Sequence, residues 1–106
     1  MAWPMLVVAG LLEVVWAFAM KQSEGFTRLW PTITMAVAMV ASFALLALSM
    51  RSLPLGTAYT VWTGIGAVGA FIVGIAFLGE TVNATRLIAA ALIVAGLALM
   101  KLSSTA

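Results

Sequence analysis

One acidic residue of this 106-residue sequence stands in the middle of an apolar segment. Glu13 lies within the run from Trp3 to Met20, which contains no other charged residue. An ionised carboxylate is costly in apolar surroundings, so it is stabilised there by a proton or by a cation. If a proton and a cation compete for one carboxylate, the movement of one becomes coupled to the movement of the other. Glu13 therefore predicts a site that binds a cation and protons in turn.

Two structural explanations compete with this reading of Glu13. The carboxylate could pair with a buried basic residue, or it could stay protonated and serve only as a hydrogen-bonding group. Lys and Arg occur only at the ends of the other apolar segments, as Lys101 does, which weakens the first explanation. Glu24 and Glu80 fall in polar connections and need no special account.

Side chains suited to a cation accompany Glu13 on three segments. Residues three and four apart share a helix face. The three faces so defined are Gly10, Glu13, Trp16 and Ala17; Met39, Ser42, Phe43 and Leu46; and Tyr59, Trp62, Thr63 and Gly66. The rings of Trp16, Tyr59 and Trp62 offer π faces to a cation. Ser42 and Tyr59 can hydrogen-bond the carboxylate. Core packing or lipid contact is the alternative role of each aromatic residue, and for Phe43 it is the favoured one.

The elements that must position these residues are transmembrane helices. The sequence is 65% hydrophobic and 8% charged, whereas soluble domains carry about 25% charged residues. Four apolar segments, at about 3–20, 30–50, 55–78 and 84–102, are each long enough to cross a hydrocarbon core of about 30 Å. The connections between them are short, so consecutive helices run antiparallel. We expect an all-α integral membrane protein with one four-helix domain over residues 1–106.

Several other classes of function are disfavoured by composition. The chain has no Cys and no His, and the three glutamates are too scattered to suggest a metal site. Its basic residues are dispersed singly, which disfavours nucleic-acid binding. We therefore expect neither an enzyme nor a cofactor. The first segment lacks a basic region before it and contains Glu13, so we expect a retained helix rather than a cleaved signal peptide.

Residues at the segment ends fit helix boundaries. Pro31 and Pro54 suit the first turns of the second and third helices, where a missing N–H costs nothing. Asn83 suits the N-cap of the fourth helix. The fourth helix also carries small residues, including Ala89 and Gly96 one heptad apart. They predict a close packing seam, either within one chain or between two.

The loop charges are nearly balanced across the membrane. The side that would hold both termini carries Arg51 and Lys101, and the other side carries Lys21, Arg28 and Arg86. A difference of one charge gives almost no preferred orientation by the positive-inside rule. Either weak cues orient the chain, or copies insert both ways and pair as an antiparallel dimer.

Three stretches of the sequence resemble the small multidrug resistance family. They run from Leu12 to Ala17, from Glu24 to Arg28 and from Leu53 to Gly66, and the resemblance extends over all four predicted helices. Trp16 and the Trp-Thr-Gly-Ile-Gly run that begins at Trp62 resemble the guanidinium-exporter branch. The loop from Ser23 to Trp30 looks closer to the multidrug branch.

The resemblance implies a proton-coupled antiporter in the bacterial inner membrane, working as an antiparallel, dual-topology homodimer. It implies that Glu13 of both copies binds guanidinium or protons, with lipid around the dimer. The residues that it would place around this site are Gly10, Trp16, Ser42, Tyr59 and Trp62, with Met39, Phe43 and Thr63 as portal or lining residues. Two alternatives stay open: a quaternary ammonium exporter of the same fold, and a membrane accessory subunit without transport.

Overall fold

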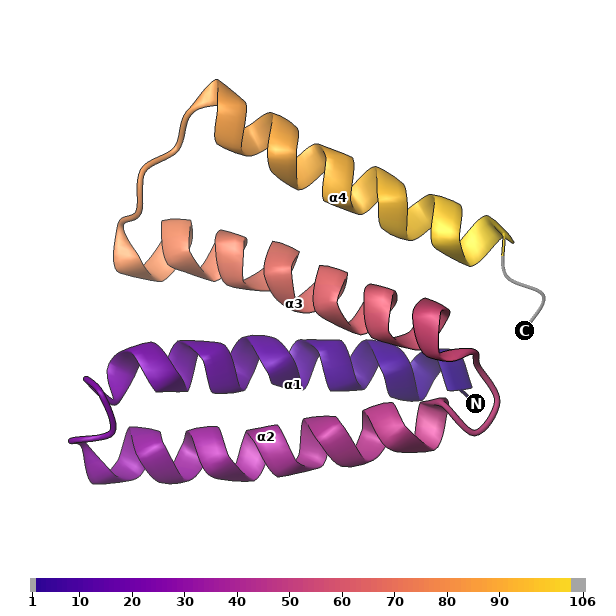
Figure 1. The fold of residues 1–106 in the computed structure, drawn as a ribbon. Coiled ribbons are helices and arrows are strands. Elements are labelled where there is room, and N and C mark those ends of the chain that lie inside the picture. Colours follow the sequence, from indigo (N-terminus) through magenta and orange to yellow (C-terminus); the bar gives the residue numbers. More distant parts are fainter. Residues whose placement is uncertain (1, 104–106) are drawn as a thin grey trace.

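Four α-helices make up the computed structural model of the chain, which describes residues 2–103 (Figure 1). They are α1 (Ala2–Gln22), α2 (Leu29–Ser49), α3 (Leu55–Leu78) and α4 (Ala84–Ser103). The prediction of a four-helix, all-α protein is confirmed. The predicted domain also included residues 1 and 104–106, which lie outside the described residues.

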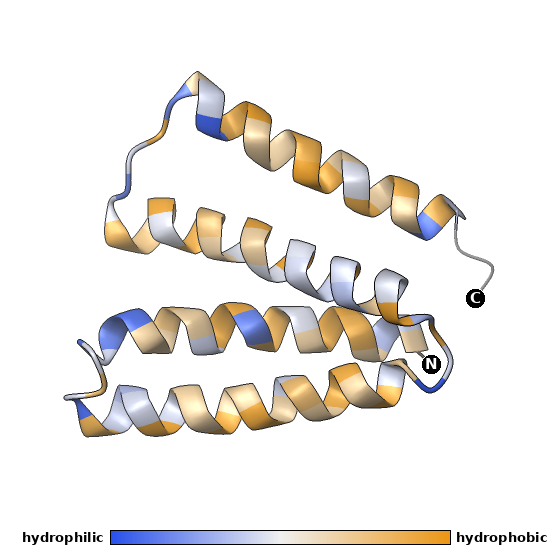
Figure 2. Cartoon of the chain, in the orientation of Figure 1, coloured by the Kyte–Doolittle hydropathy of each residue, from blue (hydrophilic) through white to orange (hydrophobic). Residues whose placement is uncertain are grey.

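All four helices are suited to a membrane. They contain 21, 21, 24 and 20 residues, and each is long and apolar enough to cross a bilayer by length and composition. Figure 2 shows hydrophobic colouring along the helices and much of the hydrophilic colouring near the connections. Length and hydropathy together indicate a multi-pass membrane protein.

The helices form a flat slab in which α1 is central. The Cα atoms extend over 43 × 35 × 16 Å, and α1 packs between α2 and α3 (Figure 1). α4 packs on α3 and diverges from it toward the connection that joins them. The last turn of α4 also reaches α1, where Lys101 Nζ lies 4.6 Å from the centroid of the Trp3 ring. The buried core therefore belongs to α1, α2 and α3.

Short-range interactions fix the helix ends. The Arg86 backbone N–H donates to Asn83 Oδ1 at 2.9 Å, so the predicted N-cap of α4 is confirmed. Pro31 lies in the first turn of α2, whereas Pro54 directly precedes α3 as its N-cap. α3 ends at Gly79, whose φ of +66° is the left-handed conformation that glycine adopts most readily.

The α1–α2 connection is a compact left-handed turn. Glu24, Gly25 and Phe26 all have positive φ, at +50°, +74° and +70°. Buried Ser23 holds the turn together, because its hydroxyl donates to Met20 O at 2.7 Å and accepts the Phe26 N–H at 3.1 Å. The turn places Glu24 at the surface, at the same end of the slab as the α3–α4 connection (Figure 1).

Candidate cation-binding site

Glu13 lies midway along α1, and its side chain turns toward α3. A Cβ atom added at Gly66 of α3 would collide with the Glu13 carboxylate. Gly66 itself is buried. The carboxylate therefore lies directly against the α3 backbone, in a space that a side chain at position 66 would fill.

Two buried polar atoms on this face of α1 have no hydrogen-bond partner within residues 2–103. They are the acceptor Glu13 Oε1 and the donor Trp16 Nε1. Leaving such a group unsatisfied costs about 1–3 kcal/mol, and more when the group is charged. The protomer thus presents one acceptor and one donor, three residues apart on a helix face, that a ligand or a second chain can satisfy.

Ser42 takes part in a hydrogen-bonded relay across three helices. Its hydroxyl donates to the Ala9 carbonyl of α1 at 2.7 Å and accepts the indole N–H of Trp62 from α3 at 3.0 Å. Ser42 is fully buried, and Trp62 is 6% exposed. The sequence suggested that Ser42 could hydrogen-bond the carboxylate; in this structure its hydroxyl links α1, α2 and α3 instead.

The aromatic residues form a continuous series over the same three helices. Ring centroids lie 6.3 Å apart for Trp16 and Phe43, 5.7 Å for Phe43 and Trp62, and 5.6 Å for Tyr59 and Trp62. Tyr59 and Phe43 are 53% and 46% exposed, so the series runs from the buried core to the protomer surface. Neighbouring rings in the series therefore pack against one another in tilted and edge-on contacts.

The other candidate residues have different surroundings. Gly10 is buried, and the Ile65 side chain occupies the space that a Cβ there would need, 2.7 Å from Ile65 Cβ. Met39 is half-buried on α2. Tyr59 and Thr63 line a groove of about 370 Å³ between α3 and α4, whose lining does not include Glu13. The groove lies on the α4 side of α3, whereas Glu13 packs on its α1 side.

The contact between Glu13 and Gly66 was not predicted. Gly66 shares a face with Trp62, but it was not among the selected site residues. The only signal in the sequence was the presence of glycines on this helix; in the structure, a Cβ at Gly66 or Gly69 would collide with an α1 side chain, Glu13 or Val14. No group of three His, Cys, Asp or Glu residues that could hold a metal ion is found in residues 2–103.

Comparison with known proteins places this chain in a family. The profile described as "Small Multidrug Resistance protein" matches residues 1–93. The chain belongs to the small multidrug resistance family. The predicted resemblance is thereby confirmed.

Curated members of the small multidrug resistance family match the chain over almost its full length. A "Guanidinium exporter" of Escherichia coli (strain K12) is 59% identical over 104 residues, which cover 98% of this chain and 99% of the relative. Proteins with the same name from Citrobacter freundii and Salmonella typhimurium are 57% identical with the same coverage. These relatives are named as transporters, not as enzymes. Their enterobacterial sources and the four apolar spans together indicate a multi-pass protein of the inner membrane.

Proposed function

We propose that this chain exports guanidinium in exchange for protons, as an antiparallel homodimer in which Glu13 of both copies binds either ligand. The other residues proposed to line the site are Gly10, Trp16, Ser42, Tyr59 and Trp62, with Met39, Phe43 and Thr63 as portal or lining residues.

The buried, unpartnered Glu13 carboxylate is the observation that carries this proposal. Oε1 lies against Gly66 with no hydrogen-bond donor in the described residues. A carboxylate in that setting binds a proton, which neutralises it, or a cation that brings donors of its own. Because both ligands satisfy the same oxygen, the release of one accompanies the binding of the other. That exclusion is the physical basis of antiport.

Guanidinium fits the chemistry of these side chains. It is planar and weakly hydrated, and the N–H groups along one edge can donate to both oxygens of a carboxylate. Its flat faces stack on aromatic rings, which the series from Trp16 to Tyr59 supplies. A quaternary ammonium ion has no N–H to donate to Glu13 Oε1. The names of the relatives agree with the smaller, donor-rich cation.

Two features of the protomer support an antiparallel dimer. α4 contributes no buried residue to the described protomer, and it carries small residues such as Ala89 and Gly96 beside exposed leucines. The balanced loop charges give little preference for one orientation.

Two oppositely oriented copies form an inverted repeat, the arrangement on which alternating access rests in many transporters. Two copies of Glu13 near one another would titrate as a coupled pair.

Replacement of Glu13 tests the mechanism. In proteoliposomes, Glu13→Gln should abolish the proton movement that guanidinium drives through the original protein, because the amide can neither ionise nor neutralise the cation. Glu24→Gln is the control, since it removes one carboxylate from an exposed turn. Proton-coupled guanidinium transport by Glu13→Gln would rule out the proposed mechanism.

A panel of substrates tests the proposed cation. Guanidinium should drive proton movement, and tetra-substituted ammonium ions should do so poorly. The opposite preference would favour the multidrug alternative. If neither cation drives proton movement through the purified protein, a non-transporting accessory role becomes the better explanation.

A further inference from the structure

A cavity between α1 and α3 extends from Val14 and Ala67 to the end of the molecule where the α1–α2 and α3–α4 connections lie. Its volume is about 300 Å³. Its lining consists of Val14, Ala17, Phe18, Lys21, Ala67, Ala70, Phe71, Val73, Gly74, Leu78 and Glu80. The inner end of the cavity is lined by Val14 and Ala67, the chain neighbours of Glu13 and Gly66, while Glu13 itself does not line it.

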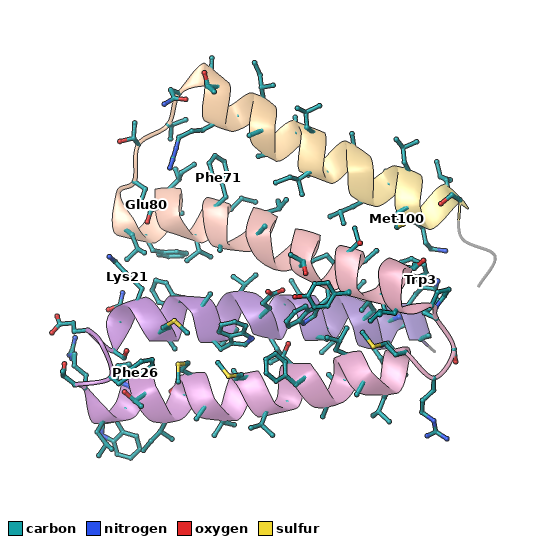
Figure 3. The ribbon with its side chains drawn as sticks, viewed as in Figure 1. Trp3, Lys21, Phe26, Phe71, Glu80 and Met100 are labelled. Carbon is teal, nitrogen blue, oxygen red and sulfur yellow. The ribbon has the colours of Figure 1, made fainter. Side chains whose placement is uncertain are left out.

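Two residues of opposite charge lie at the outer end of this cavity. Lys21 belongs to the last turn of α1, and Glu80 follows the end of α3. Both side chains are exposed and both line the cavity. Figure 3 shows them at the same end of the α1–α3 pair. A cation that enters from this face therefore meets one attracting and one repelling charge before it reaches Glu13.

The Glu80 carboxylate is held at this position by the end of α3. The left-handed turn at Gly79 lets the Glu80 backbone N–H donate to Gly74 O at 3.1 Å. The side chain folds back, so that a Cβ added at Gly74 would collide with the carboxylate. Glycine at positions 74 and 79 thus places an acidic group over the last turn of α3.

Helix stability does not explain an acidic residue at this position. The C-terminal end of a helix carries partial negative charge, which disfavours a nearby carboxylate and favours a cation. Here the carboxylate and the α3 carbonyls act together, and both attract a cation to the cavity mouth. Phe18 and Phe71 line the same cavity and offer rings to a planar cation.

We propose that the α1–α3 cavity is the route by which guanidinium passes between the aqueous face and Glu13, with Glu80 as the recruiting carboxylate at its mouth. Lys21 repels the cation, and it therefore keeps the affinity of the cavity mouth for guanidinium low enough for release. This inference rests on the proposed function and adds to it a second, peripheral residue that determines substrate affinity.

Guanidinium titrations in proteoliposomes test the role of Glu80. Glu80→Gln should raise the KM for guanidinium about two- to fivefold, the size expected for one exposed ionic interaction, with the maximal rate retained. Lys21→Gln should lower the KM by a similar factor. Glu24→Gln is the matched control, because it removes the same charge at the same end of the slab without lining the cavity. Its KM should stay close to that of the original protein.

The outcomes separate this inference from the proposed function. If Glu80→Gln and Glu24→Gln have the same KM, general surface charge is sufficient and the proposed route is wrong, while the antiport function stands. If Glu80→Gln lowers the maximal rate without a change in KM, Glu80 does not recruit the cation. If the original protein does not move protons in response to guanidinium, the proposed function itself fails.

Discussion

The position of the Glu13 carboxylate depends on the small size of a residue on the neighbouring helix. Gly66 has no side chain, so the carboxylate lies against the α3 backbone, where Oε1 is buried without a partner. A bulkier residue at 66 would push the carboxylate away or force the two helices apart. Gly66 thus acts through Glu13 and is a positioning residue.

Gly66→Ala should weaken guanidinium binding about tenfold or more, since inserting a methyl group into a packed site typically costs about 1–3 kcal/mol. Gly56→Ala is the matched control, because a Cβ added at Gly56 of the same helix meets no atom within 4 Å. Binding of guanidinium by the two variants in detergent can be compared by calorimetry. Equal affinities would show that the α3 backbone does not position the carboxylate.

At this scale the sequence identified Glu13 but not its contact. A lone carboxylate in an apolar segment is conspicuous because a charged group is costly in an apolar environment. The partner Gly66 depends on the register between α1 and α3, which side-chain spacing within one helix does not define. For the same reason, the hydrogen bond from the Ser42 hydroxyl to the Ala9 carbonyl could not be predicted from the sequence.

At the scale of the helices, the relay through Ser42 joins three elements with two hydrogen bonds. α2 supplies the hydroxyl, α1 the carbonyl of Ala9 and α3 the indole N–H of Trp62. The direct packing of α2 on α3 is slight compared with that of α1 on either neighbour. The relay therefore ties α2 and α3 together through buried polar atoms.

Ser42 and Trp62 should be energetically coupled through the hydrogen bond between them. Ser42→Ala leaves the buried Trp62 indole N–H unsatisfied and should destabilise the fold by about 1 kcal/mol or more. Trp62→Phe removes that donor, so the double variant should be more stable than the sum of the single effects predicts, by about 1 kcal/mol. Reversible unfolding in mixed micelles measures each value. Strict additivity would show that the bond contributes nothing.

Helix lengths follow from the sequence more directly than helix packing does. Hydropathy and the polar connections predicted four helices, and Asn83 correctly indicated where α4 begins. The central position of α1 could not be predicted, because the four helices have similar overall hydropathy. The prediction also stopped α1 at about Met20, whereas the helix continues through Lys21 and Gln22 and so brings Lys21 to the cavity mouth.

At the scale of the whole molecule, the described protomer is one-sided. Its core lies among α1, α2 and α3, and α4 contains no buried residue. Such a surface is compatible with lipid, with a second chain, or with both in turn. Sequence reasoning predicted a packing seam on α4 from its small residues, and two of them, Ala89 and Gly96, are exposed in the described chain.

Dual topology can be measured with one engineered cysteine, because the chain contains none. Ser52→Cys lies in the exposed α2–α3 connection. If copies insert both ways, a membrane-impermeant maleimide should label roughly half of the protein from each side, as expected when charge bias is weak. Labelling from one side only would contradict the antiparallel homodimer.

The exposed surface of α4 also divides the chain into two parts in which substitutions have different physical consequences. Substitutions within α1–α3 are tested by the chain's own interior, where glycines meet neighbouring side chains at close range. Most substitutions on α4 change a surface that faces away from the described chain, whereas Leu97 packs against Gly64 of α3. Substitutions in the first three helices then act mainly on the fold of the chain itself, and most substitutions in the fourth act mainly on its contacts with the surrounding membrane.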